Sequence, residues 1–184
     1  MAGKQLTLSQ VKAKSKEIDK MEKYEITEGQ DAGKTISFYP IFSYTKIEEL
    51  LTELQKVFIE AKEKEITISE EMNIYLIQLM MIKHFTHFKK QMPDTLIGEG
   101  KKEGLIDWLE HFRKTGLFKL ILEEVFLPTE TKKVFSSLTD FLSKSIVYSD
   151  IESEMNRKVQ DLKLKNKDVI SQIRNIDAES KPLN

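Results

Sequence analysis

Residues 69–91, SEEMNIYLIQLMMIKHFTHFKKQ, contain the stretch of this 184-residue chain that decides its fold. Their apolar side chains cover more than one face of a 3.6-residue repeat, which is typical of a helix buried on most of its surface. Ser69 is a residue type that begins helices, and Pro93 stops continuation. We therefore predict a central helix from Ser69 to about Gln91. Its predicted apolar positions are Met72, Tyr75, Leu76, Leu79, Met80, Ile82, Phe85 and Phe88.

The most apolar part of this helix, IYLIQLMMI at 74–82, is too short to be a membrane span. It is about half the length needed to cross a bilayer, and Lys83 and His84 follow it directly. The beginning of the chain, MAGKQLTLSQVKAKSK, contains no apolar stretch that could serve as the core of a signal peptide. We expect a cytoplasmic protein, in the cytoplasm of the host cell if it is encoded by a phage.

Further helices are predicted on both sides of the central one. Residues 45–64, TKIEELLTELQKVFIEAKEK, begin with a Thr45-x-x-Glu48 capping box. Short helices are expected in LIDWLEHFRKTG, with Gly116 at its end, and in LFKLILEEVF, and a long helical stretch begins at Thr129. The apolar stripe of the 45–64 helix consists of Ile47, Leu50, Leu51, Leu54, Phe58 and Ala61.

A β-hairpin is predicted before these helices. YEIT (24–27) and TISFYP (35–40) are rich in strand-forming residues, and the polar, glycine-containing segment EGQDAGK separates them. An isolated two-stranded hairpin is marginally stable and leaves its edges unpaired. It therefore either docks on its own helices, the commoner arrangement, or extends a sheet with a neighbouring chain. Phe38, Tyr39 and Phe42 lie on or just after it and are candidate partner-binding residues.

Composition and charge bound the fold class and its partners. The chain is 40% hydrophobic and 32% charged, with seven Gly and four Pro, which fits a globular protein with long helices. Its net charge is −1, and residues 1–23 are Lys-rich whereas the middle is acidic, so no basic surface favours nucleic acid. We predict a mainly α protein: a Lys-rich leader helix (1–23), a domain of hairpin and helices (24–150), and a long C-terminal helix (151–184).

The C-terminal segment carries a heptad-like pattern. Apolar residues and one asparagine recur at alternating steps of about four and three residues, as in a coiled coil, where a central asparagine fixes register. The pattern is short, and the alternative is one amphipathic helix that lies on its own domain or frays. The candidate partner-binding residues of this seam are Val159, Leu162, Asn166, Val169, Ile173 and Ile176, and Met155 precedes them in the same pattern.

No catalytic, metal-binding or cofactor-binding site is predicted. His84 and His87 lie three residues apart on the central helix, but zinc requires at least three protein ligands, and the paired-histidine metalloprotease signature is absent. Because Phe85 and Phe88 alternate with them, we expect partly buried structural histidines with backbone or hydroxyl partners such as Thr86. The chain has no cysteine and contains no P-loop, dinucleotide-binding or nucleophile-elbow motif. We expect a protein that is not an enzyme.

Several short strings together resemble a known protein family. LTLSQVKAKSKEIDKMEKYEI, GKTISFYPIFSYTKIEELLTEL, IKHFTHF and GLFKLILEEVF resemble the tail assembly chaperones of long-tailed phages and prophages of Gram-positive bacteria. The resemblance covers about residues 6–127. It implies a small, mostly helical, non-enzymatic protein that binds the tape measure protein, helps recruit tail-tube subunits and associates with copies of itself.

A second class of function is compatible with the same residues. A small phage- or prophage-encoded regulator or inhibitor could bind a host or rival protein through a helical face. The two hypotheses differ in the partner that they predict: a tail component for the chaperone, and a host protein for the regulator.

Overall fold

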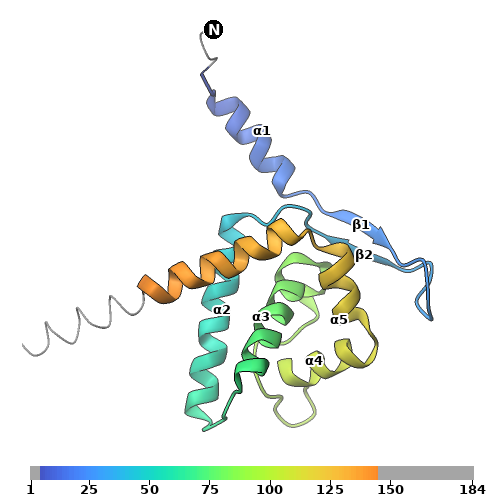
Figure 1. The fold of residues 1–184 in the computed structure, drawn as a ribbon, viewed down its shortest axis with the longest axis vertical. Helices are drawn as coiled ribbons and strands as arrows, with labels where there is room; N and C mark the ends of the chain where they lie inside the picture. The colour runs from blue at the N-terminus through green and yellow to red at the C-terminus, as the bar shows by residue number, and fades with distance from the viewer. Residues whose placement is uncertain (1–4, 145–184) are drawn as a thin grey trace, which may run out of the picture. The chain divides into compact units, whose positions relative to one another are not determined.

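A computed structural model of the chain describes residues 5–144 (Figure 1). The chain divides into two compact units, residues 1–138 and residues 139–184. All the elements labelled in Figure 1 belong to the first unit. The predicted seam from Val159 to Ile176 lies outside the described residues, so it stays a prediction, as do the predicted domain boundaries.

The fold is mainly helical, with a two-stranded antiparallel hairpin near the N-terminus and a helix toward the C-terminus, which confirms the predicted fold class. A last helix covers residues 128–144. None of the described helices is both long enough and apolar enough to span a bilayer. The elements are α1 (Leu8–Ile18), β1 (Glu22–Glu25), β2 (Thr35–Phe38), α2 (Tyr44–Glu63), α3 (Glu70–Phe85), the 3-10 helix η1 (His87–Lys90), α4 (Leu105–Lys114), α5 (Leu117–Leu120) and the π-helical turn η2 (Ile121–Val125).

The hairpin docks on the helices of its own chain. β1 and β2 pair with Tyr24 opposite Ile36, and the connecting turn uses Gly33 at φ +82°, a conformation that glycine adopts without strain. Beyond β2, the backbone N–H of Tyr39 donates to the carbonyl of Phe85, 2.9 Å away at the end of α3. An isolated bridge also joins Phe38 to Thr86. The edge of β2 is therefore partly satisfied by α3, as the first of the two alternatives predicted.

Helix α2 begins two residues earlier than the expected Thr45 capping box. Ser43 is the N-cap, and its hydroxyl accepts a hydrogen bond from the N–H of Lys46. The prediction of Thr45 was wrong because Ser43 is also a capping residue and the backbone is already helical at Tyr44. The buried stripe agrees with the prediction except at one position, where Val57 replaces Phe58. Its residues are Ile47, Leu50, Leu51, Leu54, Val57 and Ala61.

Helix α3 is the central helix, as predicted, and Ser69 is its N-cap. It ends at Phe85 rather than near Gln91, because Thr86 is extended at φ −126° and ψ 174°. The Thr86 hydroxyl donates to the carbonyl of Ile82 at 2.7 Å and accepts from the N–H of Phe88, so it ends one helix and starts η1. Every residue from Leu79 to Phe85 is buried, including the charged Lys83.

Aromatic side chains from distant segments form the core next to the hairpin. The rings of Phe42 and Phe85 stack with centroids 3.6 Å apart and planes 6° apart, and Phe126 meets Phe42 edge-on at 5.0 Å. Val134, in the helix that follows, is fully buried. These contacts join the segment before α2, the end of α3 and the segment after η2.

Glycines shape the loop at 97–104 and the end of α4. A Cβ atom on Gly104 would lie 2.4 Å from the backbone nitrogen of Gly98, so two backbone segments approach more closely than any side chain permits. Gly116, at φ +75°, separates α4 from α5, as predicted. Helix α4 buries Leu105, Leu109 and Phe112.

Candidate binding surfaces

The structure separates the three partner-binding candidates near the hairpin. Phe38 and Tyr39 are half-buried, and the ammonium group of Lys46 lies 4.3 Å from the centre of the Tyr39 ring. Phe42 is only 1% exposed and belongs to the aromatic core. Its backbone N–H donates to the carboxylate of Glu130 at 2.7 Å. The partner-accessible part of this region is therefore Phe38 and Tyr39, and Phe42 lies beneath it.

The two histidines of the central helix point to different partners. The Nε2 atom of His84 lies 2.7 Å from a carboxylate oxygen of Glu53 on α2. The Nδ1 atom of His87 lies 3.3 Å from the N–H of Ser37, which donates to it from β2. His87 thus has the backbone partner that we expected, whereas His84 is fully buried and bonds a carboxylate. Among the described residues, no group of three or more histidine, aspartate or glutamate side chains is arranged to hold a metal ion.

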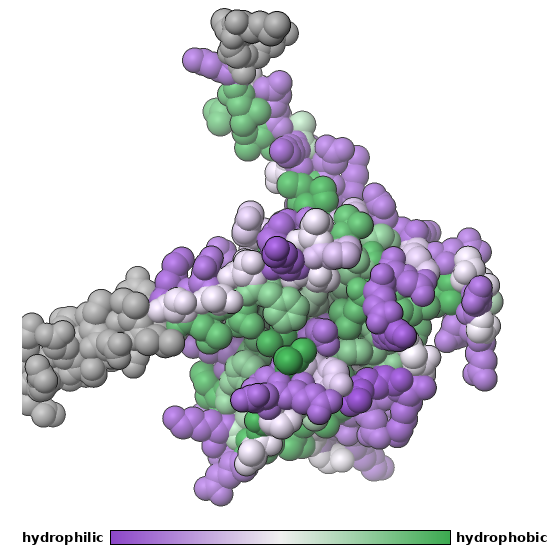
Figure 2. Space-filling view, in the orientation of Figure 1, coloured by the Kyte–Doolittle hydropathy of each residue, from purple (hydrophilic) through white to green (hydrophobic). Residues whose placement is uncertain are grey.

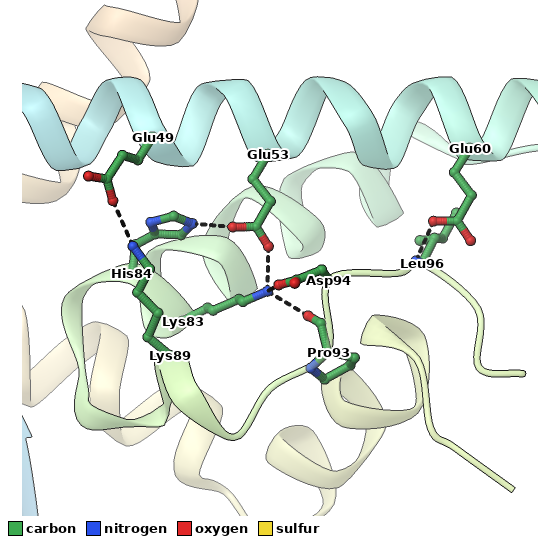
Figure 3. A network of polar contacts seen from close by, with 9 residues as sticks. All are labelled: Glu49, Glu53, Glu60, Lys83, His84, Lys89, Pro93, Asp94 and Leu96. Carbon is green, nitrogen blue, oxygen red and sulfur yellow. Dashed lines mark hydrogen bonds and ion pairs between the residues drawn. The ribbon is translucent and has the colours of Figure 1, made fainter.

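Lys83 is the centre of a buried network of charged groups (Figure 3). Its side chain is 1% exposed, and its ammonium group donates to the carboxylates of Glu53 and Asp94 and to the carbonyl of Pro93. An ammonium group has three N–H donors, so all of them are used. These hydrogen bonds connect α2, α3 and the segment after η1. Glu53 also accepts from His84, which adds a second contact between α2 and α3.

Glu53 remains ionised because of these donors. Burial alone raises the pKa of its carboxyl, but hydrogen bonds from His84 and Lys83 outweigh that effect and lower the pKa to about 2. The other ring nitrogen of His84, Nδ1, is buried and has no hydrogen-bond partner within residues 5–144. The carboxylate of Glu53 is therefore held beside the ammonium group of the buried Lys83.

Glu60, two turns further along α2, holds the next part of the same segment. Its carboxylate accepts from the backbone N–H of Leu96 at 2.8 Å (Figure 3). It also forms an ion pair with Lys64. Burial raises the pKa of this carboxyl, and the hydrogen bonds from Lys64 and Leu96 lower it further than burial raises it. Two carboxylates of α2, Glu53 and Glu60, therefore position residues 93–97.

An acidic cleft lies along α2, next to this network. It has a volume of about 520 Å³, and we call it the α2 cleft. Four carboxylates and two lysines line it, which is a formal charge of −2. Figure 3 shows the ion pair of Glu49 with Lys89, at 2.6 Å, on one side of His84 and Glu53 on the other. The lining residues are Thr45, Glu48, Glu49, Thr52, Glu53, Lys56, His84, Lys89 and Asp94.

A second, more apolar groove lies between α3 and α4. It has a volume of about 560 Å³, and we call it the α3/α4 groove. Met72, Ile106 and Leu109 form its apolar part, and Glu110, Arg113 and Lys114 provide its charges. Arg113 is also held over the ring of Tyr75, 4.4 Å from its centre, so its position is partly fixed. The groove combines an apolar floor with a net positive rim.

Helix α1 exposes apolar side chains. Leu8 is 87% exposed and Val11 is 48% exposed, and α1 contains no buried residue. The N-terminal end of α1 is nevertheless well formed, because Thr7 and Gln10 make a reciprocal capping box. In Figure 2, hydrophobic and hydrophilic residues occupy different sides of this helix. α1 is an amphipathic helix whose apolar side is uncovered in a single copy of the chain.

Sequence reasoning missed the charged network and both cavities. Lys83 and Glu53 are 30 residues apart, and an isolated lysine after an apolar run usually reaches solvent. One feature of the sequence did indicate burial of Lys83. Its neighbours in the central helix are predicted to be buried on more than one face of that helix. A helix that is apolar nearly all round leaves little exposed surface for the residues between.

The fold and these surfaces define a class: a small, mainly helical protein with a docked hairpin and uncovered apolar and acidic surfaces. A family model described as YomO matches residues 8–179, and the chain belongs to this phage- and prophage-associated family. It is accordingly a phage-related protein. No curated protein and no solved structure matches the chain.

Proposed function

We propose that this protein is a non-enzymatic tail assembly chaperone that binds the tape measure protein and helps recruit tail-tube subunits in the cytoplasm of the host cell. The family membership supports a phage-related role. The resemblance of residues 6–127 to tail assembly chaperones supports the more specific one. The single structural observation behind the proposal is the α3/α4 groove.

This groove suits an amphipathic helix, which is the form that a long helical tape measure protein presents. Helices bind grooves by inserting apolar side chains spaced three and four residues apart. Ile106 and Met72 are half-exposed, so they can contact such side chains without unfolding the domain. Methionine adapts its shape to different partners, which suits a surface that must bind successive segments of a long helix. Arg113 and Lys114 favour acidic residues beside the apolar stripe of the partner.

A co-purification experiment tests this function. The full chain is expressed with a fragment of a long helical tape measure protein, and retention of the fragment is measured. Ile106→Glu places a charge in the groove and should reduce retention at least about tenfold, because the charge must be buried on binding. Ile59→Glu is the matched control: Ile59 is 49% exposed on α2 and does not line the groove.

The outcomes separate the hypotheses. Retention of the fragment by wild type and Ile59→Glu, with loss in Ile106→Glu, is the expected result. No retention by the wild-type chain, or equal retention by Ile106→Glu, contradicts the proposal. Recovery of a host protein and no tail component from infected cells would instead favour the regulator.

A further inference from the structure

We propose that Arg113 determines the specificity of the α3/α4 groove. Its guanidinium group, held over the ring of Tyr75, selects helices that carry an aspartate or glutamate about two turns from the apolar side chain seated on Ile106. The inference rests on the proposed function only in that a helix binds this groove. It adds which acidic residue the bound helix must carry, and where.

Arg113 carries the unpaired positive charge of the groove. The other two charged residues that line it, Glu110 and Lys114, form an ion pair with each other at 2.7 Å. They lie one turn apart on α4, so their charges largely cancel at the rim. Arg113 makes no ion pair with any residue in 5–144. Its charge is therefore open to a carboxylate of a partner.

Tyr75 holds the Arg113 guanidinium in place. The guanidinium carbon, Cζ, lies 4.4 Å from the centre of the Tyr75 ring, so this side chain of α4 reaches across to α3. The ring is itself held by two contacts: its hydroxyl donates to the carboxylate of Glu71 at 2.8 Å, and the ring of Phe118 meets it edge-on at 6.0 Å. Because these contacts restrict the arginine side chain before a partner arrives, less conformational entropy is lost on binding.

A guanidinium group that lies over an aromatic ring keeps its edge free for a carboxylate. The N–H donors of the group lie in its plane, whereas the ring contacts its face. Arginine can then donate two parallel hydrogen bonds to the two oxygens of one carboxylate, a geometry that lysine lacks. Aspartate and glutamate are thus the side chains that Arg113 recognises.

The spacing of Ile106 and Arg113 fixes where the acidic residue belongs. The two residues are seven positions apart on α4, which is two turns and roughly 10 Å along the helix axis. A partner helix that is aligned with α4 and seats an apolar side chain on Ile106 therefore places a residue about seven positions away beside Arg113. The expected partner has an apolar stripe with an acidic residue at that distance from one of its apolar positions.

A protein helix is the occupant that the groove favours over a ligand with phosphate groups. Met72, Ile106 and Leu109 make its floor apolar, and Arg113 is the one unpaired cation among the residues that line it. Nucleic acids and anionic lipids are bound by several cations together. An amphipathic helix with one acidic residue matches both the apolar floor and the single charge.

Binding of synthetic helices to the full chain tests the inference. Three peptides of about 20 residues, long enough to be helical, share one leucine stripe. They differ only at the positions about seven residues before and after the central leucine, which are glutamate, glutamine or lysine. Fluorescence anisotropy measures the Kd of each. The wild-type chain should bind the glutamate peptide about tenfold more tightly than the lysine peptide, with glutamine between them, because only glutamate pairs with Arg113.

Two variants test Arg113 and its support. Arg113→Glu should reverse the order, so that the lysine peptide binds most tightly. Tyr75→Leu removes the ring beneath the guanidinium and keeps the charge, so it should retain binding while the preference for glutamate falls to about twofold. Loss of folding would weaken all three peptides alike. Lys101→Glu, the matched charge reversal at an exposed residue outside the groove, should keep the wild-type preference.

The outcomes separate this inference from the proposed function. Peptide binding that Ile106→Glu abolishes, but that is equal for glutamate and lysine, overturns the role of Arg113 and leaves the groove as the helix-binding site. An Arg113→Glu variant with the wild-type order overturns it in the same way. Absence of binding by every peptide also overturns the inference, whereas the proposed function is decided by retention of the tape measure fragment. Arg113-dependent binding to single-stranded DNA that exceeds binding to the glutamate peptide overturns the choice of a protein helix.

Discussion

Helices α1 and α3 begin with the same kind of N-cap, but α1 is exposed and α3 is buried. Each starts at a hydroxyl side chain that accepts a backbone N–H: Thr7 for α1 and Ser69 for α3. Yet α1 buries none of its residues, whereas α3 is buried continuously from Leu79 to Phe85. The comparison shows that local signals are enough to start a helix, while burial depends on what the rest of the chain places around it.

The two helices also reverse the usual distribution of polar and apolar groups. Helix α3 buries an ammonium group, and α1 exposes a leucine. The buried Lys83 is tolerated because Glu53, Asp94 and a carbonyl accept all its donors. The exposed Leu8 has no such compensation among the described residues.

The largest expected effect comes from Lys83→Ala. Removing the ammonium group leaves the largely buried carboxylate of Glu53 with His84 as its remaining partner, and breaking a buried pair in this way costs about 3–5 kcal/mol. The free energy of unfolding is measured with chemical denaturant. Lys16→Ala on α1 is the control and should change it by no more than about 0.5 kcal/mol. A similar small change in both variants would show that the network does not stabilise the fold.

The next largest difference in the free energy of unfolding is expected between alanine substitutions at two leucines, one buried and one exposed. Leu79→Ala should lower the free energy of unfolding by about 3 kcal/mol, because Leu79 is fully buried and its removal leaves a cavity. Leu8→Ala, the same change at an 87% exposed position, should have almost no effect on a monomeric sample. Equal destabilisation by the two substitutions would mean that α1 is part of the core.

Acid titration should reveal the contribution of Glu53 to the free energy of unfolding. Its pKa falls from an ordinary 4.5 to about 2 on folding, so the stabilisation is fully present above pH 4.5 and is lost as pH falls toward 2. At 1.36 kcal/mol per pKa unit this shift corresponds to about 3–4 kcal/mol, and solvent screening of the partly exposed carboxyl reduces the expected size to about 2–3 kcal/mol. The free energy of unfolding of Glu53→Gln should therefore fall less steeply over this range. Glu48→Gln should follow the wild-type curve, and parallel curves for all three proteins would contradict the assignment.

The smallest effect is expected at the cap of α1. Thr7→Ala removes a capping box, which costs the helix about 1 kcal/mol. Far-ultraviolet circular dichroism should show a small loss of helix, while the cooperative unfolding midpoint of the domain stays unchanged because α1 buries nothing. A shifted midpoint would show that α1 contributes to the core of its own copy.

The errors of the sequence predictions have identifiable physical causes. The end of α3 was placed near Gln91 because nothing local forbids helix at Thr86, whose extended backbone is held by contact with β2. By sequence, Phe42 is a partner-binding candidate because aromatic residues beside a hairpin are often exposed. Its stacking on Phe85 depends on a residue 43 positions away. The α2 cleft and the α3/α4 groove could not be predicted, because each combines residues from elements that only folding brings together.

By itself, the sequence determined the fold class, the hairpin and the central position of α3, since these follow from hydrophobic periodicity, turn residues and capping side chains that act within a few residues. Only the tertiary structure decided that Lys83 is buried against Glu53 and that Leu8 and Val11 of α1 remain uncovered. The physical reason is the separation along the chain over which each kind of interaction acts. Hydrogen bonds within a helix turn are local, whereas the partner of a buried charge and the cover of an apolar face come from segments that are distant in the chain or from another molecule.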